Sequence, residues 1–280
     1  MKHRLINGIA ADYVSVMDRG LHYGDGVFET IACNAGSAQF VRDHLARMRA
    51  GAGRLDIPFP DQALFMQDIT TLLPRVGETG DCVIKLMLTR GSGRRGYRYD
   101  RPQAPTRISV RSAWPEHVDR WKQGVRTRFC ETPVSVNPRL TGIKHLNRLD
   151  NVLASAELGE RYEEGFMMDP QGRVIEGTMS NVFAVIDGVL VSPDLAHCGI
   201  QGIIRDKLLR AAAGHGQPTQ IRALQRHELL DADEVFVCNS VLGVCPVTQI
   251  DELHKRPGEI TSMLDQILRQ LIKLDAQATE

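Results

Sequence analysis

The chain has no excess of either charge. Its 34 lysines and arginines balance 34 aspartates and glutamates, so a basic surface for nucleic acid is not expected. The longest apolar runs are far too short to span a bilayer, and the N-terminal stretch MKHRLINGIAADY lacks the apolar segment of a signal peptide. We therefore expect a cytoplasmic protein with no nucleic-acid partner and no membrane partner.

Closely spaced cysteines are also missing. Metal clusters and redox pairs need such spacing, and no two of the six cysteines form a Cys-x-x-Cys motif, so we predict no metal site. Several cysteines lie in apolar runs such as VFVCNS, where cysteine behaves as a small buried hydrophobe. We expect reduced core cysteines at all six positions, which are Cys33, Cys82, Cys130, Cys198, Cys238 and Cys245.

The composition is that of an ordinary globular protein. Of the 280 residues, 42% are hydrophobic and 24% are charged, which excludes collagen-like and disordered chains. Strand-like and helix-like stretches alternate in both halves, and tight turns such as Asn7-Gly8 join neighbouring strands. This pattern predicts an α+β fold of two units with mostly antiparallel sheets and flanking helices.

A proline-containing polar stretch divides the chain. Trp114-Pro115 cannot continue a central strand, because proline lacks the backbone N–H. We place an N-terminal α/β domain at residues 1–113, an interdomain connector at 114–122 and a C-terminal domain at 123–280.

Helical spacing of apolar residues predicts several helices. One follows Asp43, a candidate N-cap, and another opens at Asp61. A third covers NRLDNVLASAELGERY. Its apolar residues share one face and are Leu149, Val152, Leu153 and Ala156.

The run Gly91-Ser92-Gly93-Arg94-Arg95-Gly96 matches the GxGxxG fingerprint of dinucleotide-binding proteins. That fingerprint also needs a helix to begin within it. Pro102 and Pro105 forbid a helix in the residues that follow. We therefore expect a glycine loop that displays Arg94 and Arg95, whose guanidinium groups suit carboxylates and phosphates. A solvated basic loop with no ligand is the alternative.

Two further residues could carry chemistry. Lys144 precedes a helix, where an amine held away from bulk water is a competent nucleophile and base; Lys85 and Lys207 are its rivals. Glu176 ends an apolar strand beside Gly177 and could face either water or a ligand nitrogen.

The stretch GIQGIIR is a glycine turn that opens a helix. The backbone N–H groups of Ile203 and Ile204 could bind an anion there, and Ser240 could add a hydroxyl donor. A lysine for the aldehyde, a carboxylate for the pyridine nitrogen and a helix N-terminus for the phosphate are what a pyridoxal 5′-phosphate site requires.

The motifs, taken in order, resemble those of the fold-type IV pyridoxal-phosphate enzymes. That family includes branched-chain and D-amino-acid aminotransferases and aminodeoxychorismate lyases. The resemblance runs from about Ile6 to about Val247, and GIKHLNRL with RGSGRRGY is most similar to the lyase branch. The stretches that carry it are DRGLHYGDGVFET, HLARM, RGSGRRGY, GIKHLNRLDNVLA, VIEGTMSNVF, GIQGIIR and EVFVCNS.

The resemblance implies a role for nine residues. Lys144 would bind the cofactor's aldehyde, and Glu176 would bind its pyridine nitrogen. Arg95 and Tyr97 would bind a substrate carboxylate, and Arg94 stands where the lyases more often have glycine. The remaining implied cofactor ligands are Arg47, Asn181, the amides of Ile203 and Ile204, and Ser240.

The function implied is that of a lyase in folate biosynthesis, which converts 4-amino-4-deoxychorismate to 4-aminobenzoate and pyruvate. A class IV aminotransferase on the same scaffold is the first alternative, and a non-catalytic dimeric binding protein is the second. The resemblance also implies a homodimer.

Overall fold

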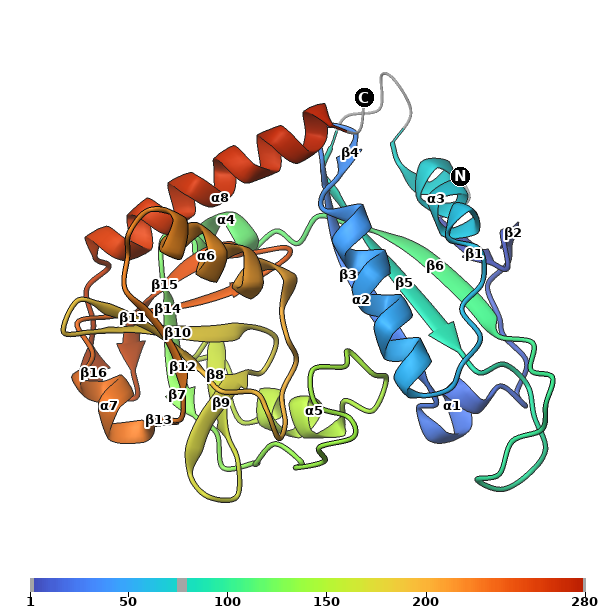
Figure 1. Ribbon diagram of the computed structural model, residues 1–280, viewed down its shortest axis with the longest axis horizontal. Helices are drawn as coiled ribbons and strands as arrows, with labels where there is room; N and C mark the ends of the chain where they lie inside the picture. The colour runs from blue at the N-terminus through green and yellow to red at the C-terminus, as the bar shows by residue number, and fades with distance from the viewer. Residues whose placement is uncertain (1–2, 75–79, 279–280) are drawn as a thin grey trace. The chain divides into compact units, whose positions relative to one another are not determined.

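The computed structural model describes residues 3–74 and 80–278, and the chain divides into two compact units (Figure 1). Unit 1 comprises Met1–Pro115, Ile143–Asn147 and Asp275–Glu280, and unit 2 comprises Glu116–Gly142 and Arg148–Leu274. The first division falls after Pro115, within the stretch 114–122 that the sequence marks as a connector. Within the described residues, no helix is both long and apolar enough to cross a membrane.

Unit 1 is built on a six-stranded sheet with the order β2-β1-β6-β5-β3-β4, in which each neighbouring pair is antiparallel. Its longest strands are β3, β5 and β6. The strands are β1 (Arg4–Ile6), β2 (Ile9–Ala10), β3 (Gly26–Asn34), β4 (Ser37–Ala38), β5 (Cys82–Thr89) and β6 (Thr106–Ala113).

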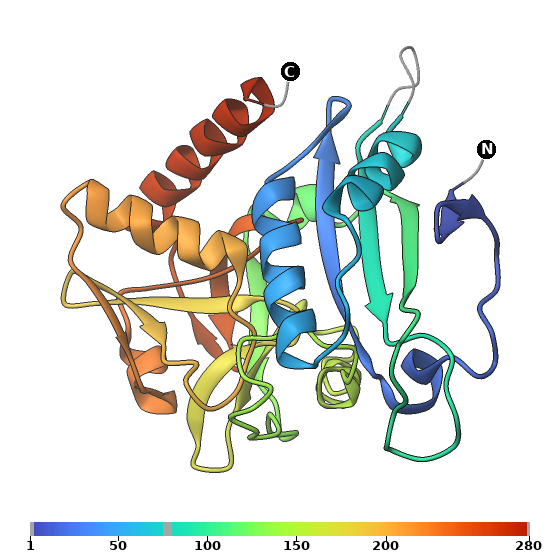
Figure 2. The same ribbon diagram turned by 45° about the vertical axis from the view of Figure 1, so that its right-hand side comes forward.

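Three helices accompany this sheet: α1 (Arg19–Tyr23), α2 (Val41–Arg54) and α3 (Gln62–Leu72). Helix α2 runs alongside β3 in both views (Figures 1 and 2). Its apolar residues and those of α3 join the strands in one buried core, which includes Ile31, Leu45, Met48, Phe65, Ile84 and Leu86.

The tight turns of unit 1 follow the predicted pattern. Asn7 and Gly8 both have positive φ between β1 and β2, as a type I′ hairpin turn requires. Asp61 caps α3, as predicted, by accepting a hydrogen bond from the Ala63 N–H. The predicted cap at Asp43 is wrong, because α2 begins at Val41 and Asp43 lies in its first turn.

Unit 2 is built on a ten-stranded sheet with the order β12-β11-β10-β14-β15-β7-β8-β9-β13 and with β16 paired to β15. Most of its pairs are antiparallel, but β7 is parallel to both β8 and β15, and β11 is parallel to β12. Its strands are β7 (Val125–Phe129), β8 (Glu164–Met168), β9 (Arg173–Gly177), β10 (Asn181–Ile186), β11 (Val189–Pro193), β12 (Thr219–Arg222), β13 (Leu224–Gln225), β14 (Glu234–Asn239), β15 (Gly243–Ile250) and β16 (Leu253–His254).

The helices of unit 2 are α4 (Val118–Trp121), α5 (Leu149–Ala156), α6 (Ile203–Gly214), α7 (Arg226–Asp231) and α8 (Glu259–Gln277), whose last residues belong to unit 1. Helix α5 is shorter than the sequence predicts. Its apolar residues Leu149, Val152 and Leu153 share a face as predicted, yet they are 75%, 60% and 58% exposed. All six cysteines are free and buried, as expected.

Candidate active site

Lys144 lies on a short segment that extends the sheet of unit 1. The Phe28 N–H donates to the Lys144 carbonyl at 2.9 Å, and the Leu146 N–H donates to the Gly26 carbonyl at 3.0 Å. Ile143, the preceding residue, is buried in the core against α2. These contacts fix the backbone on both sides of Lys144 against β3. The half-buried lysine places its Nζ 4.4 Å from the centre of the Phe28 ring.

Arg47 lies on α2 and forms a buried ion pair with Glu29 on β3. Its Nε and Nη2 donate to the two carboxylate oxygens of Glu29 at 2.8 and 2.5 Å, and His44 Nδ1 lies 2.7 Å from the same carboxylate. Burial alone would raise the pKa of Glu29, but Arg47 and His44 lower it to about 2. The Glu29 carboxylate therefore holds the Arg47 side chain in place.

Glu176 is the penultimate residue of β9 and is buried in unit 2. Its Oε2 accepts a hydrogen bond from the Ile200 N–H at 2.8 Å. Arg148 is near enough for the charge of Glu176 to affect its pKa: burial lowers the pKa of Arg148, and Glu176 acts in the opposite direction. Glu176 is thus fixed by the loop that leads into α6.

Asn181, the first residue of β10, holds the same loop from the other side. Its Nδ2 donates to the Ile200 carbonyl at 2.9 Å. A Cβ at Gly202 would lie 1.9 Å from the Asn181 Oδ1, so any side chain there would force Asn181 or the loop to move. Glu176 and Asn181 therefore bind the N–H and the carbonyl of Ile200, and they bring the chain close to the sheet just before α6 begins.

Helix α6 starts at this point, directly after the loop that Glu176 and Asn181 bind. Gly202 is the N-cap residue and makes no side-chain cap hydrogen bond. Ile203 and Ile204 are the first two residues of the helix, where N–H groups have no intrahelical partner and the helix dipole favours an anion. Asn181 pairs with Cys238 across β10 and β14, so Ser240, two residues beyond, follows the same edge of the sheet as Asn181.

Glu164 supports this edge and was missed by the sequence analysis. It is buried at the start of β8, and its carboxylate accepts from the Thr178 and Ser180 hydroxyls at 2.5 and 2.7 Å. It also accepts from the Thr178 N–H. Glu164 thereby closes the turn between β9 and β10, which carry Glu176 and Asn181. In the sequence it is one of two adjacent glutamates, and nothing local distinguishes the buried one.

The glycine loop after β5 forms no helix, as predicted. Gly91 has a φ of +86°, and a Cβ there would lie 2.0 Å from the Ala104 carbonyl oxygen. A Cβ at Gly93 would lie 2.9 Å from the Arg19 Cδ, and Gly96 has a φ of +101°. The backbone conformation or the local packing therefore explains each glycine of the apparent fingerprint, without a bound dinucleotide.

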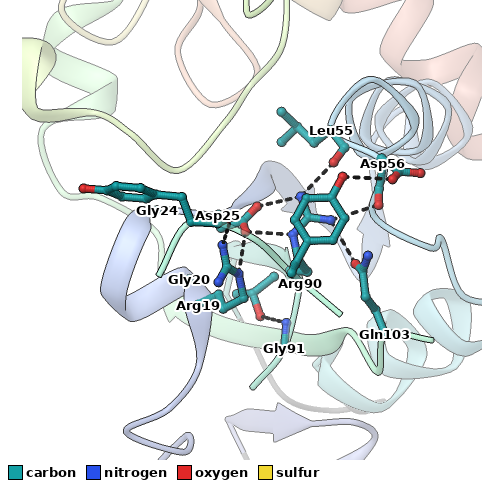
Figure 3. Close-up of polar contacts among 12 residues, drawn as sticks. Arg19, Gly20, Gly24, Asp25, Leu55, Asp56, Arg90, Gly91 and Gln103 are labelled. Atoms are coloured by element: carbon teal, nitrogen blue, oxygen red, sulfur yellow. Dashed lines mark hydrogen bonds and ion pairs between the residues drawn. The ribbon is translucent and has the colours of Figure 1, made fainter. Parts of the chain in front are cut away.

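The charged side chains of this loop are exposed. Arg94 pairs with Asp100 at 3.1 Å, and Arg95 is exposed beside it. Tyr97 is 86% exposed, and its ring centre lies 5.5 Å from that of Tyr23 on α1. Arg19 binds the backbone of the loop at the Gly96 and Tyr97 carbonyls, and Arg90 binds the Gln103 side chain; both arginines also bind Asp25 (Figure 3).

The structure thus gathers the predicted residues in two groups. In unit 2, the loop before α6 connects Glu176 and Asn181 with the N-terminus of α6, and Ser240 follows the strand paired with β10. In unit 1, Lys144 contacts Phe28 and Arg47 binds Glu29. Phe28 and Glu29 are neighbours on β3, and their side chains lie on opposite faces of the sheet. Of the rival lysines, Lys85 is exposed on β5 and Lys207 lies on α6.

Comparisons with known proteins identify the family. Residues 26–250 match the model of amino-transferase class IV, and the chain belongs to this family. It is 36% identical over 247 residues to the aminodeoxychorismate lyase of Vibrio harveyi, covering 88% of this chain and 90% of the relative. These matches confirm the family and the fold class that the motifs predict.

Solved structures agree with this assignment. The crystal structure of 4-amino-4-deoxychorismate lyase from Pseudomonas aeruginosa has a TM-score of 0.89 and 44% sequence identity, and the match covers 95% of this chain and 98% of that one. A putative branched-chain-amino-acid aminotransferase of Methanocaldococcus jannaschii is 33% identical over 266 residues, 92% of this chain and 91% of the relative.

Members of this family depend on pyridoxal phosphate, and the local structure fits the group. In unit 2, a buried carboxylate, the N-terminus of α6 and the close approach at Gly202 are found together. In unit 1, Arg47 supplies a guanidinium, and His44 has a buried Nε2 with no hydrogen-bond partner. The helix N–H groups and the guanidinium are donors of the kind that a phosphate requires, and the carboxylate is an acceptor of the kind that a protonated pyridine nitrogen requires.

Proposed function

We propose that the protein is a pyridoxal-phosphate-dependent aminodeoxychorismate lyase. It would convert 4-amino-4-deoxychorismate to 4-aminobenzoate and pyruvate, a reaction of folate biosynthesis. The observation that carries the proposal is the match, over nearly the whole of both chains, to a lyase structure at 44% identity. The curated lyase at 36% identity supports the same function.

The cofactor-binding residues follow from the contacts within each unit. Glu176 would accept a hydrogen bond from the protonated pyridine nitrogen, because its carboxylate is buried and already oriented by the Ile200 N–H. The Ile203 and Ile204 N–H groups and the Ser240 hydroxyl would donate to the phosphate, and Asn181 would act by holding the loop before α6. Arg47 would supply a cation for the phosphate, with its guanidinium oriented by Glu29.

The reaction requires the removal of a proton from the amine-bearing carbon of the substrate. When bound, pyridoxal phosphate supplies the electron sink that makes the proton on the substrate's amine-bearing carbon removable. The Lys144 Nζ would first bind the cofactor's aldehyde and, once released by the substrate amine, would take that proton. The backbone contacts of Lys144 with β3 limit the positions of its amine, which is how orientation contributes to the rate.

Arg95 and Tyr97 would bind a carboxylate of the substrate. The substrate is a ring-shaped dianion, and the exposed guanidinium of Arg95 can bind a carboxylate with two parallel hydrogen bonds. The Tyr97 hydroxyl can donate a third.

Loss of the enolpyruvyl group then makes the ring aromatic, which drives the reaction forward.

An aminotransferase on the same scaffold is the second candidate. The 33% identity to a putative branched-chain-amino-acid aminotransferase favours it, and both activities would use Lys144 and Glu176. An aminotransferase must consume a keto acid as its second substrate, whereas the lyase consumes none. This difference in stoichiometry separates the two functions.

The proposal includes a homodimer in the cytoplasm. The exposed apolar face of α5 supports the homodimer, because three large apolar side chains on one short helix are suited to an interface. Leu153→Glu would place a charge on this face, and light scattering should then show monomers where the wild type shows dimers. The six free, buried cysteines fit a reducing compartment.

The decisive experiment is to mix the purified protein with 4-amino-4-deoxychorismate and quantify the products. The proposal expects 4-aminobenzoate and pyruvate in equal amounts, with no added keto acid required and none consumed. A second reaction supplies D-alanine or a branched-chain amino acid with a keto acid. Amination of the keto acid at a good rate, with no release of pyruvate from aminodeoxychorismate, would establish the aminotransferase instead.

A further inference from the structure

The loop of residues 91–103, here called the glycine loop, is held by arginines that point away from solvent. Arg19, on α1, donates from Nη1 to the Gly96 carbonyl at 2.8 Å and from Nη2 to the Tyr97 carbonyl at 3.1 Å. Its side chain is only 5% exposed. These carbonyls directly follow Arg95 in the chain, so Arg19 fixes the backbone at the residue proposed to meet the substrate.

A second contact from α1 reinforces the first. The Tyr23 hydroxyl accepts a hydrogen bond from the Gly96 N–H at 3.1 Å, and the Arg19 guanidinium lies 4.7 Å from the centre of the Tyr23 ring. Both polar groups of the Gly96 backbone are therefore bound by α1. The missing side chain at Gly93 leaves the space that the Arg19 stem occupies.

Arg90 holds the far end of the same loop. All five of its N–H donors are used. Two bonds go to Asp25, two to the Leu55 and Asp56 carbonyls, and one to the Gln103 side chain. The Tyr99 ring also stacks on Arg90, with its centre 3.8 Å from the guanidinium carbon. Arg90 thus has no donor left for a substrate, in spite of its place beside the glycine motif.

One carboxylate joins the two arginines. Asp25 accepts from Arg19 Nε at 2.9 Å and from Arg90 Nε at 2.7 Å, and Figure 3 shows both guanidinium groups directed at it. The side chain of Asp25 is 14% exposed and those of both arginines are 5% exposed. Buried cations are costly without a counter-ion, so Asp25 makes it possible for two of them to hold the loop together.

We propose that Arg19 is a positioning residue for substrate recognition, which it sets through the backbone of Gly96 and Tyr97. Arg19 never needs to touch the substrate. It fixes the direction in which Arg95 and Tyr97 project, with Asp25 and Arg90 as its support. The inference rests on the proposed function for the identity of the substrate, and on the contacts of unit 1 alone for the position of the loop.

The geometry requires an arginine and not merely a positive charge. The three acceptors of Arg19 are a carboxylate and two successive carbonyls, which the planar guanidinium reaches with three different nitrogens. A lysine has one nitrogen on a flexible stem. Lysine at position 19 would keep the pair with Asp25 and release the glycine loop.

The test compares Arg19→Lys, Arg19→Gln and Tyr23→Phe with the wild-type holoenzyme. Hydrogen exchange of peptides that cover residues 91–103 reports the position of the loop without reference to activity. Steady-state kinetics with aminodeoxychorismate report recognition, and titration of the apoenzyme with pyridoxal phosphate reports cofactor affinity. Asp100→Asn is the matched control, because it removes only the exposed pair with Arg94 on the same loop.

We expect Arg19→Lys and Arg19→Gln to raise the KM by roughly tenfold or more, as the loss of charge-assisted hydrogen bonds implies, with a smaller change in kcat. Exchange of the loop should accelerate by a similar factor, while cofactor affinity stays within about twofold, since the contacts of Arg19 lie elsewhere. Tyr23→Phe should give a smaller change of the same kind, and Asp100→Asn should leave all three measurements unchanged.

Unchanged loop exchange in Arg19→Gln would overturn the proposal, and so would full recovery of exchange and KM in Arg19→Lys. Faster exchange with an unchanged KM would also overturn it, because recognition would then not depend on the loop position. If the wild type makes no 4-aminobenzoate, the proposed function fails separately. The KM for the amino donor that the enzyme does use then replaces the lyase KM, and the same comparison decides the role of Arg19.

Discussion

The candidate residues of the two units are held by different means. In unit 1, carboxylates bind arginine side chains: the half-buried Asp25 binds Arg19 and Arg90, the buried Glu29 binds Arg47, and the buried Asp68 binds Arg107. In unit 2, the buried carboxylates at the candidate site bind backbone N–H groups and hydroxyls, as Glu176 and Glu164 do.

This difference determines what each unit tolerates. An ion pair depends on the charges of both side chains, so the contacts in unit 1 should be sensitive to changes of charge and of pH. Backbone contacts need close approach, so the site in unit 2 should be sensitive to added atoms. The predictions below, from the largest expected effect to the smallest, test this contrast.

The largest effect should come from the amine of unit 1. Lys144→Ala should lower turnover by roughly 10⁴-fold, because it removes the group that moves the proton. It should also abolish the covalent attachment of the cofactor to the protein by borohydride reduction. Peptide mapping of the labelled wild-type protein should place the label on Lys144.

Lys85→Ala is the matched control. The Lys85 Nζ lies 5.0 Å from the centre of the same Phe28 ring that Lys144 contacts, yet Lys85 is exposed on β5. This variant should retain its label and its turnover. A label on Lys85 or Lys207 would contradict the assignment of Lys144.

The Glu29 ion pair should make the stability of the protein depend on pH. The pKa of Glu29 is lowered from 4.5 to about 2, so the stability it contributes is present above pH 4.5 and is lost as the pH falls toward 2. The difference corresponds to at most about 3 kcal/mol. Glu29→Gln should therefore be less stable than the wild type at neutral pH, and the gap in the free energy of unfolding should narrow in acid.

Urea denaturation at several pH values measures this gap. Glu131→Gln is a suitable control, because Glu131 is 89% exposed and pairs with Arg128 only at 3.9 Å. Its unfolding free energy should follow that of the wild type at every pH. A constant gap between Glu29→Gln and the wild type from neutral pH to pH 3 would show that charge is not what stabilises this site.

Glu176→Gln tests the carboxylate of unit 2. Glutamine can still accept the hydrogen bond from the Ile200 N–H, so the loop before α6 should keep its position. It cannot hold the pyridine nitrogen protonated, and turnover should fall by roughly one to two decades, the value of a charge-assisted hydrogen bond. Lysine labelling should persist. An enzyme with full activity would exclude this role for Glu176.

The smallest effect should come from adding one methyl group at one end or the other of α6, in two separate variants. Gly202→Ala would place a Cβ 1.9 Å from the Asn181 Oδ1, so Asn181 or the loop must move. We expect a loss of stability of about 1–3 kcal/mol and weaker binding of pyridoxal phosphate. Gly214→Ala, at the other end of the same helix, meets nothing within 4 Å and should be neutral or slightly stabilising.

Thermal unfolding and cofactor titration of the two alanine variants decide the matter. Equal behaviour would mean that the close approach at Gly202 has no functional value. A loss confined to Gly202→Ala would support the view that unit 2 binds its ligand through backbone proximity.

Local features of the fold could be predicted from the sequence, and features that depend on distant residues could not. The Asn7-Gly8 turn and the Asp61 cap involve neighbours in the chain and are confirmed. The cap of α2 was missed because its Phe40 N–H donates to Asp275, 235 residues away. The parallel pairing of β7 with β8 and β15 likewise has no local signal.

The candidate site shows the same division. The strand end at Glu176 and the glycine turn before Ile203 follow from local patterns. Arg47 followed only from the family resemblance, because four arginines lie close together on or near α2 and periodicity does not distinguish them. Arg19 and Asp25 were overlooked because their partners, the glycine loop and Arg90, lie 65 to 78 residues further along.

The insertion of residues 143–147 into the sheet of unit 1 has a consequence for the order of assembly during synthesis. The first 115 residues emerge from the ribosome with the Gly26–Phe28 edge of β3 still lacking the segment that carries Lys144. The chain must first extend through β7, a strand of the other unit, before that segment is available. Sequence separations of this size slow folding, so Lys144 reaches its place only after the nascent unit 1 has remained with an unpaired strand edge.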